Sequence, residues 1–318
     1  MCTAITYRAG HSFFGRNLDL EYHYKEAVTI TPRNYRFPFE NKPAHALIGI
    51  ATTERNYPLY YDAMNEAGLA MAGLNFPHSA AYTPCKQSKK AIAPYEFIPW
   101  VLRRFSSVKE AAEKLRKITL CDVPFEGFPQ AKLHWMLSDK HQSITIEQTK
   151  NGLQLYSNPV DVLTNEPPFP YQMTNLANYR NLSVNQPDNN ICPTVPLPLY
   201  SQGMGAMGLP GDVSSASRFV RAVFTNQNAK KQDDEAAAIG QFFHILNTVN
   251  QTEGCVAVND KLEKTVYTSC ADQDNGIYYY TTYENSQITA VHLYHEDLNG
   301  TALIHYPLSF CQHIRMEN

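Results

Sequence analysis

The chain has 318 residues, of which 43% are apolar and 18% are charged, and its formal net charge is −3. This composition is typical of a folded globular protein and excludes an intrinsically disordered chain. The charge is small and the longest basic cluster, "KQSKK", is short. The sequence therefore argues against a nucleic-acid-binding surface.

The N-terminal twenty residues are interrupted by Arg8, Arg16 and Asp19, so they do not form the apolar core of a signal peptide. No later apolar run approaches the length of a membrane span. We therefore expect a cytoplasmic protein without a membrane partner.

The seven cysteines are odd in number and include no CxxC pair, and we expect them to be thiols. Neither these cysteines nor the eleven histidines fall at the spacing of metal ligands. We expect no metal ion and no cofactor.

The first 75 residues are predicted to be β structure. Short segments rich in β-branched and aromatic residues alternate with turn residues, which is typical of strands. These segments are 2–7, 12–19, 27–32, 46–52 and 68–76.

Two helices are predicted next. The first covers 94–105 and has Pro94 at its start, where a missing N–H costs little. The second covers 106–118 and opens with Ser107–x–x–Glu110, a capping-box pattern.

The middle of the chain returns to strands and then leaves regular structure. The strands are predicted at 133–139, 143–149 and 153–158. The Pro- and Asn-rich stretch 165–209 predicts a long surface excursion or a partly helical lid. Within it, the Gly- and Met-rich segment 200–212 suits a pliable loop over a site.

The last part of the chain predicts two helices and a strand meander. The helices cover 214–224 and 234–249, and the second has one apolar face at helical spacing. This face consists of Ile239, Phe242, Phe243, Leu246 and Val249. Strands follow over 264–294, with a hairpin turn at 274–276.

The elements thus run in the order sheet, helices, sheet, helices, sheet, without βαβ alternation. This order favours an α+β fold in which helices enclose two antiparallel sheets. No linker divides the chain, so we expect one domain over 1–318.

Cys2 directly follows Met1. If Met1 is removed, one residue carries a thiol and a free α-amine, with ordinary pKa values of about 8.5 and about 8. That residue could supply both the nucleophile and the base that amide cleavage needs. A hairpin between 2–7 and 12–19 would bring Arg16 beside Cys2, where its charge lowers both pKa values, and Asp19 would orient the amine.

A structural interpretation of these residues stays open on the terminus alone. Cys2 could be a small hydrophobic residue on an outer strand, and Arg16 and Asp19 could form a surface ion pair.

Several sequence blocks, taken together and in order, resemble the choloylglycine hydrolase family, which includes bile salt hydrolases and penicillin V acylases. The resemblance runs from residue 2 to about residue 295. The blocks are "MCTAITY", "FFGRNLD", "DAMNEAGLAMAGLNFP", "LHWMLSD", "VLTNEPPF", "GLPGDVSSASRFVRA", "QFFHILNTV" and "YTSCADQDNGIYYYTTYENSQI".

The resemblance implies an N-terminal-nucleophile hydrolase with a four-layer αββα sandwich. It implies that Cys2 is the nucleophile, exposed by removal of Met1, and that Arg16 and Asp19 flank it. It further implies an oxyanion hole made by the backbone N–H of Asn75 and the side chain of Asn165.

The same resemblance implies that Arg218 completes the polar shell. Without the family resemblance, Asn75 would be interpreted as a turn residue before Pro77 and Asn165 as the first residue of a loop. Arg218 would be interpreted as a solvent-facing helix residue.

Within the family, an asparagine at Asn75 resembles the bile salt hydrolase branch, whereas penicillin V acylases more often have tyrosine there. The implied substrate is a steroid acid joined by an amide bond to glycine or taurine. A rigid steroid needs an apolar trough beside the nucleophile. We expect Leu18, Tyr24, Phe125 and Phe128 to line it.

The implied reaction is amide hydrolysis through a thioester, which could also pass the acyl group to another amino acid. Two alternatives stay open. One keeps this chemistry for penicillin V or an N-acyl homoserine lactone, and the other is a steroid- or lipid-binding protein without catalysis. Family analogy also implies a homotetramer, with the stretch after Asn165 as a contact arm.

Overall fold

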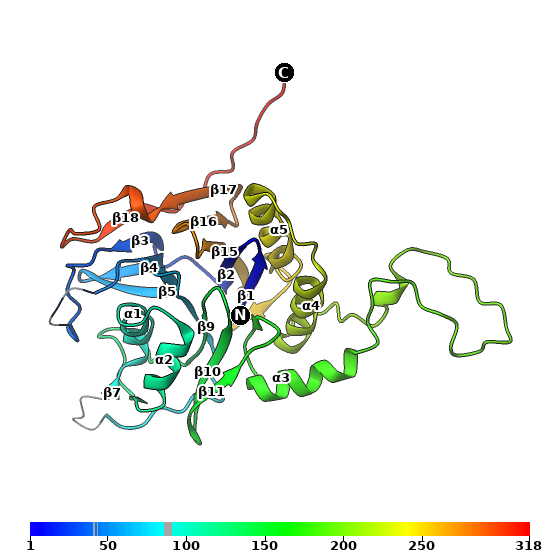
Figure 1. Ribbon diagram of the computed structural model, residues 1–318, viewed down its shortest axis with the longest axis horizontal. Helices are drawn as coiled ribbons and strands as arrows, with labels where there is room; N and C mark the ends of the chain where they lie inside the picture. Colours follow the sequence, from blue (N-terminus) through cyan, green and yellow to red (C-terminus); the bar gives the residue numbers. More distant parts are fainter. Residues whose placement is uncertain (41, 43, 86–90) are drawn as a thin grey trace.

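The computed structural model describes residues 1–40, 42, 44–85 and 91–318. Two large antiparallel sheets form its centre (Figure 1). The six-stranded sheet has the order β12-β1-β2-β15-β16-β17. Its strands are β1 (Cys2–Ala9), β2 (His11–Leu20), β12 (Val162–Leu163), β15 (Lys264–Asp272), β16 (Ile277–Thr282) and β17 (Asn285–His292).

The eight-stranded sheet has the order β11-β10-β9-β6-β5-β4-β3-β18. Its strands are β3 (Ala27–Thr31), β4 (Leu47–Glu54), β5 (Tyr57–Asn65), β6 (Ala70–Asn75), β9 (Leu133–Ser138), β10 (Ser143–Thr149), β11 (Gly152–Ser157) and β18 (Ile304–Pro307). Two short pairs complete the strands, β7 (Ala91–Ile92) with β8 (Thr119–Leu120) and β13 (Ala257–Val258) with β14 (Lys261–Leu262).

Helices cover the outer face of each sheet (Figure 1). On one side α4 (Ser215–Asn228) and α5 (Glu235–Asn247) pack on β1, β2 and β15. On the other side α1 (Phe97–Leu102) packs on β5 and β6, with α2 (Val108–Leu115) in the same apolar cluster. The expected α+β sandwich with four αββα layers is confirmed.

Side-chain alternation explains why the eight-stranded sheet can lie between two layers. In β6, Ala70, Ala72 and Leu74 belong to the core shared with the six-stranded sheet, whereas Met71, and Leu69 just before the strand, belong to the cluster under α1. Successive side chains on a strand point to opposite faces. A strand that is apolar at nearly every position is therefore buried on both faces.

The expected helices are present with altered bounds: α1, α2 and α5 are shorter than predicted, whereas α4 continues to Asn228. Ser107 is the N-cap of α2, and its side chain accepts a hydrogen bond from the Glu110 N–H. The apolar face expected over 239–249 is buried in the main core. Helix α5 itself ends at Asn247, so Val249 contributes to that face from just beyond the helix.

The sequence-based strand set was incomplete. It omitted β5, a central strand, and β18, an edge strand. Pro58 and Pro307 weaken the strand signal, because proline cannot donate to a ladder. Pro58 is tolerated because it lies opposite Thr53, next to the end of the β4–β5 ladder.

The stretch 165–209 is a surface excursion, as expected, and it is partly helical. It contains α3 (Phe169–Leu176) and the 3-10 turns η2 (Ala177–Tyr179) and η3 (Met204–Ala206). After α3 the chain leaves the body of the protein and returns before α4 (Figure 1). The remaining 3-10 turns are η1 (Pro94–Glu96) and η4 (Leu293–His295). Within the described residues, no helix has both the length and the apolar character that crossing a membrane needs.

Gly15 allows β2 and β15 to approach closely. A Cβ atom at Gly15 would overlap the backbone of Ser269 and Cys270. We expect Gly15→Ala to lower the free energy of unfolding by about 1–3 kcal/mol or more, because the strands must separate. Urea denaturation measures this loss, and an unchanged midpoint would contradict the packing argument.

Gly240→Ala is the matched control for this substitution. Gly240 lies inside α5, and nothing within 4 Å would touch a Cβ atom there. Because glycine disfavours a helix interior, this change is expected to raise stability by about 0.5–1 kcal/mol.

Candidate active site

The β1–β2 hairpin places Cys2 beside Arg16, as the sequence predicted. Gly10, at a φ of 73°, makes the turn between the two strands. Cys2 lies opposite Leu18, and Ala4 lies opposite Arg16. Since alternate residues share a face, Cys2 and Arg16 are diagonal neighbours on one side of the sheet. Cys2 is 2% exposed, so its sulfur is shielded from solvent.

Asn165 connects the residues around Cys2. Its side-chain oxygen accepts hydrogen bonds from the Cys2 N–H at 2.7 Å and from Arg218 Nη2 at 2.8 Å. Its side-chain nitrogen donates to the Asn75 carbonyl at 2.9 Å. Its own N–H donates to Ser215 Oγ at 2.8 Å, which fixes the loop after β12 against the start of α4. One amide thus holds Cys2, Asn75 and Arg218 together.

Arg218 is buried in α4 and points into the site, not toward solvent. Its Nη1 donates to the Cys2 carbonyl and to Thr3 Oγ1, both at 2.6 Å. Burial lowers the pKa of Arg218, and the negative charges of Asp19 and Cys2 work against that shift. The guanidinium therefore holds the first two residues of β1 in place.

Arg16 is the second buried guanidinium of the site. It donates from Nη1 to the carbonyls of Gly73, at 2.5 Å, and Tyr61, at 3.2 Å. In the described part of the chain, its Nη2 has no hydrogen-bond partner. Burial works to lower the pKa of Arg16, but the charges around it, those of Cys2, Tyr267, Asp62 and Asp19, raise it overall. The arginine is a fixed positive charge beside Cys2.

Asp19 and Met1 lie on the far side of Cys2. The Met1 amine donates to the Asp19 carbonyl at 2.8 Å and contacts the carboxylate of Glu263, and the Asp19 N–H donates to the Met1 carbonyl at 2.9 Å. The Asp19 side chain accepts from Thr265 Oγ1 at 2.7 Å. Burial raises the pKa of Asp19, opposed by Arg218 and the terminal amine. Burial also lowers the pKa of that amine.

The sequence analysis missed several polar residues that support this site. Asp62 on β5 accepts hydrogen bonds from Tyr267, at 2.6 Å, and from Ser269 and Tyr278. Burial raises the pKa of Asp62, and the nearby charge of Arg16 counteracts it. No pattern in the sequence connects β5 with β15, and β5 itself was not predicted. The sequence therefore could not indicate that Asp62 supports the site.

A second group of residues that the sequence analysis missed fixes the backbone on both sides of Asn165. The ring of buried His134 lies 3.0 Å from Glu147 and 2.8 Å from the carbonyl of Thr164, and it stacks on Phe76. This cluster fixes the backbone directly before Asn165. Glu166 accepts from the N–H groups of His78 and Ser79, which fixes the backbone directly after it.

The four residues expected to line an apolar trough lie in three places. Leu18 is buried opposite Cys2. Tyr24 follows β2, and its hydroxyl donates to Tyr22 at 2.8 Å. Phe125 packs against Phe128, Tyr57 and Tyr95 in the cluster under α1. Leu18 is adjacent to Cys2, and the lining roles of all four residues stay predictions.

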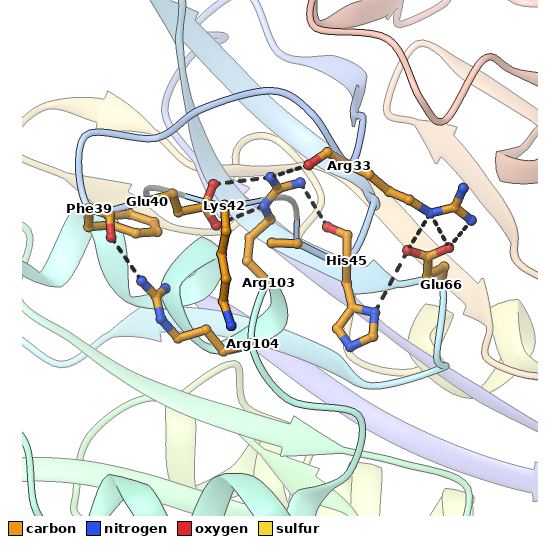
Figure 2. A pocket seen from close by; sticks show the side chains of 9 residues that line it. Arg33, Phe39, Glu40, Lys42, His45, Glu66, Arg103 and Arg104 are labelled. Atoms are coloured by element: carbon orange, nitrogen blue, oxygen red, sulfur yellow. Dashed lines mark hydrogen bonds and ion pairs between the residues drawn. The ribbon is translucent and has the colours of Figure 1, made fainter.

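A cavity of about 550 Å³ lies elsewhere, between the chain after β3 and the end of α1 (Figure 2). Its Arg103 and Arg33 are paired with Glu40 and Glu66. Burial would raise the pKa of Glu66, but bonds from His45 and Arg33 lower it to about 2. None of the predicted site residues lines this cavity, so it is separate from the candidate active site.

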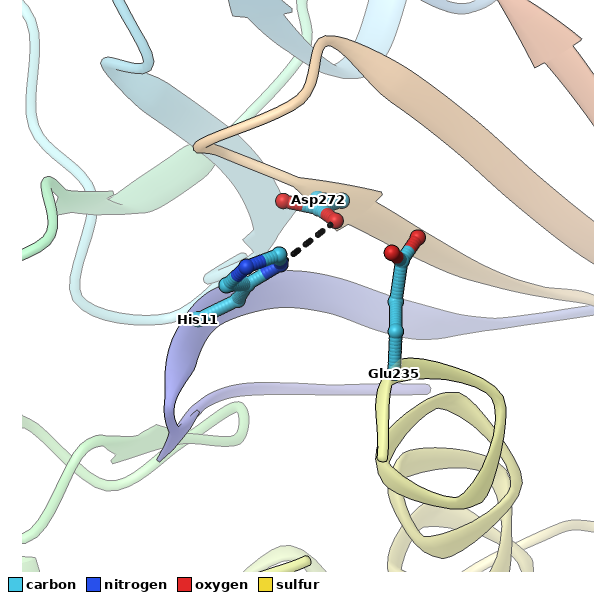
Figure 3. Close-up of side chains that lie close together, drawn as sticks. All are labelled: His11, Glu235 and Asp272. Carbon is cyan, nitrogen blue, oxygen red and sulfur yellow. Dashed lines mark hydrogen bonds and ion pairs between the residues drawn. The ribbon is translucent and has the colours of Figure 1, made fainter. Parts of the chain in front are cut away.

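His11, Glu235 and Asp272 form one group with metal-ligand atoms within 4.8 Å of one another (Figure 3). They come from distant parts of the chain, so sequence spacing could not reveal them. The Asp272 carboxylate already contacts His11 at 3.3 Å and accepts from Asn275 Nδ2 at 3.0 Å. These contacts tie β2 to the turn after β15, which accounts for the group structurally.

The arrangement around Cys2 is suited to nucleophilic chemistry at a carbonyl carbon. The charges of Arg16 and Arg218 both act on Cys2, and the side-chain amide of Asn165 lies against its backbone nitrogen. Such fixed dipoles and charges stabilise a thiolate and a developing oxyanion. Cys2 N is part of a peptide bond while Met1 is attached, and becomes an amine only when Met1 is removed.

Known proteins resemble this chain along almost its whole length. The model of the family "Linear amide C-N hydrolases, choloylglycine hydrolase family" matches residues 2–306. A "bile salt hydrolase/transferase" of Lactiplantibacillus plantarum is 52% identical over 314 residues, covering 97% of each chain. The C2A mutant of conjugated bile acid hydrolase from Clostridium perfringens superposes with a TM-score of 0.92 at 38% identity, covering 100% of both chains.

A penicillin V acylase from Agrobacterium tumefaciens shares the fold alone. Its TM-score is 0.75 at 21% identity, with 95% of this chain and 90% of that chain covered. The family model and the relatives extend over both sheets and all the residues that surround Cys2. The resemblance seen in the sequence is therefore confirmed, and the chain belongs to the choloylglycine hydrolase family of linear amide C–N hydrolases.

Proposed function

We propose that this chain hydrolyses the amide bond between a bile acid and glycine or taurine, with Cys2 as the nucleophile. Its relatives named as bile salt hydrolases support the substrate class. The observation that carries the residue assignment is the burial of Cys2 among Arg16, Asn165 and Arg218.

The reaction begins with a maturation step. Removal of Met1 turns the Cys2 nitrogen into an α-amine, 2.7 Å from the side-chain oxygen of Asn165. That oxygen would then orient the amine so that its lone pair can take the thiol proton. Arg16 and Arg218 favour the thiolate electrostatically.

The thiolate attacks the amide carbonyl, and the carbonyl oxygen gains negative charge. We assign its stabilisation to the backbone N–H of Asn75 and the side-chain amide of Asn165. Asn165 Nδ2 donates to the Asn75 carbonyl, and this contact between the two residues supports the assignment. Donors preorganised in this way contribute most where water is excluded.

The protonated α-amine then gives its proton to the departing glycine or taurine. The acyl group stays on Cys2 as a thioester until water attacks it. An added amino acid at high concentration would intercept the same thioester and form a new conjugate. Arg16, Asp19 and Arg218 hold charge and orientation through both steps, and none of these steps requires a metal ion or a cofactor.

The steroid needs an apolar wall beside Cys2. Leu18 supplies one, because it lies opposite Cys2 on the neighbouring strand. We assign Tyr24, Phe125 and Phe128 to the outer part of the trough. The alternative acyl substrates, penicillin V and N-acyl homoserine lactones, would use the same nucleophile and differ only in this wall.

The first test is Cys2→Ala. We expect the wild type to release glycine from glycocholate, and to release phenoxyacetate from penicillin V more slowly. Cys2→Ala is expected to lose both activities, because no other group replaces the sulfur. Product release measured by mass spectrometry, with circular dichroism as a check of the fold, decides the matter.

Cys311→Ala is the matched control, because Cys311 is exposed near the C-terminus. Full activity in Cys2→Ala would overturn the assignment of the nucleophile. Turnover of penicillin V alone would overturn the substrate class. Saturable binding of glycocholate without turnover in the wild type would instead indicate a binding protein.

The second test is Asn165→Ala. Because this change removes an oxyanion donor and the partner of the Cys2 nitrogen, we expect kcat to fall by roughly 10²–10³-fold. Steady-state kinetics on glycocholate measure the loss. Asn178→Ala is the control, since Asn178 is exposed and its side chain contacts only Asn175. Equal kcat values for the two variants would remove Asn165 from the mechanism.

We also propose that the chain forms a homotetramer through a contact arm, defined as residues 180–203. The arm is closed at its base by the Ser183 N–H, which donates to the Gly205 carbonyl at 2.9 Å. Its apolar side chains are exposed, with Ile191 at 89% and Tyr200 at 80%. An exposed apolar segment of this size is typical of an interaction surface.

This proposal predicts a native mass of four chains for the wild type. Replacing both Ile191 and Tyr200 by Asp is expected to lower the native mass, because charges would be buried at the contact. Light scattering coupled to size exclusion measures it. Ile314→Asp, at an exposed position in the C-terminal tail, is expected to leave the mass unchanged. A monomeric wild type would exclude the arm as a contact.

A further inference from the structure

Cys85 and Cys121 lie against each other although they are 36 residues apart in sequence. Their sulfur atoms are 2.9 Å apart. This is shorter than an ordinary non-bonded sulfur contact and about 1 Å longer than a disulfide bond. Cys85 is exposed, whereas Cys121 is 3% exposed. The pair therefore combines one accessible thiol with one protected thiol.

Backbone pairing holds the two residues in this arrangement. Thr83 forms a parallel bridge with Cys121, and the Asp122 N–H donates to the Thr83 carbonyl at 2.8 Å. The Thr83 N–H donates to the Leu120 carbonyl, and the Cys121 N–H donates to the Ile92 carbonyl at 3.0 Å. The sulfur contact thus follows from the register of two anchored segments.

We propose that Cys85 and Cys121 are a thiol–disulfide modification site that reacts with a low-molecular-weight disulfide of the glutathione class. The Cys85 thiolate attacks one sulfur of the small disulfide and releases one small thiolate. Cys85 then carries a mixed disulfide. Cys121 loses its proton and attacks Cys85 Sγ, which expels the second small thiolate. In total, two protein thiols are oxidised to one disulfide and one small disulfide is reduced to two thiols.

Accessibility sets the order of these steps. Cys85 is reached from solvent, and Cys121 is shielded by the strands around it. Burial, together with the neighbouring Cys85, raises the pKa of Cys121 to about 12. Because the thiolate is the reactive form, Cys121 reacts poorly with an outside reagent, but its sulfur is close enough to resolve a mixed disulfide on its neighbour.

The other cysteines provide internal controls. Cys255 and Cys311 are exposed as well. Within the described part of the chain, no other two cysteine sulfurs are in contact, so these residues can accept glutathione but cannot close an intramolecular bond. An intramolecular disulfide therefore identifies a paired site, whereas a mixed disulfide with glutathione indicates only an exposed thiol.

The modification would fix a segment that reaches the candidate active site. The Tyr82 hydroxyl accepts from the Leu133 N–H at 2.9 Å, and Leu133 lies opposite Asn75 in the sheet. Ser79 donates from its N–H and its hydroxyl to Glu166. The segment 76–85 is therefore held at one end beside Asn75 and Asn165, and the disulfide would hold its other end.

The test equilibrates the full-length protein in glutathione buffers of increasing oxidised fraction. Acid quenching, alkylation of free thiols and non-reducing peptide mapping then locate each product. We expect one cross-linked peptide pair containing Cys85 and Cys121, which disappears on addition of dithiothreitol, while Cys255 and Cys311 carry glutathione only. A stable mixed disulfide at Cys85, or an unmodified Cys85, in the wild type would overturn the proposal.

Two single variants separate the steps. Cys121→Ser is expected to stop at the mixed disulfide on Cys85, because no resolving sulfur remains. Cys85→Ser is expected to leave Cys121 unmodified, because that thiol is buried. A Cys85→Ser protein whose Cys121 takes up glutathione as fast as Cys255 would contradict the assigned order. If either variant fails to fold, peptide mapping of the wild-type protein still tests the proposal.

Discussion

The side-chain amide of Asn165 is the interaction on which the candidate site depends. It accepts from the Cys2 N–H and Arg218, and it donates to the Asn75 carbonyl. Cys2 belongs to the six-stranded sheet and Asn75 ends a strand of the eight-stranded sheet. One amide therefore connects both sheets at the edge where the thiol lies. An aspartate could accept but not donate at this position, and a leucine could do neither.

Burying two guanidinium groups around a thiol requires compensation. Isolated charges are costly in a protein interior, and they persist only when paired or hydrogen-bonded. Backbone carbonyls provide much of this compensation, those of Tyr61 and Gly73 for Arg16 and those of Cys2 and Val213 for Arg218. Because carbonyls carry no net charge, they do not neutralise the positive charges of Arg16 and Arg218 near the sulfur of Cys2. Backbone groups of β1, β5, β6 and the segment directly before α4 thus hold the two guanidinium groups in place as well as forming the fold.

Local pattern predicted the parts of the site that are close in sequence. Alternating apolar residues on both sides of Gly10 predict the hairpin, and the hairpin alone brings Arg16 to Cys2. The same reasoning failed for Arg218, whose helical context suggests a solvent-facing side chain. Its partners, Cys2 and Asn165, are 216 and 53 residues away, and no periodicity carries that information. Only the family resemblance placed Arg218, Asn75 and Asn165 in one site.

Neither local sequence pattern nor the family resemblance predicted two other features. Asp62 lies on β5, where Pro58 obscured the strand, and its three hydroxyl partners come from β15 and β16. The contact of Cys85 with Cys121 depends on the register between a loop and a short strand pair. Register over short parallel bridges is set by tertiary packing and leaves no trace in composition.

The setting of Met1 has a consequence for biosynthesis. Its side chain is only about one-quarter exposed, and its amine is held between the Asp19 carbonyl and Glu263. An aminopeptidase needs an extended, accessible chain end, which the finished hairpin denies it. The proposed mechanism requires excision of the initiator, and we therefore expect it to come early, while the nascent chain is emerging and before β1 pairs with β2. Under that mechanism, slow excision relative to folding would trap molecules that are fully folded yet inert.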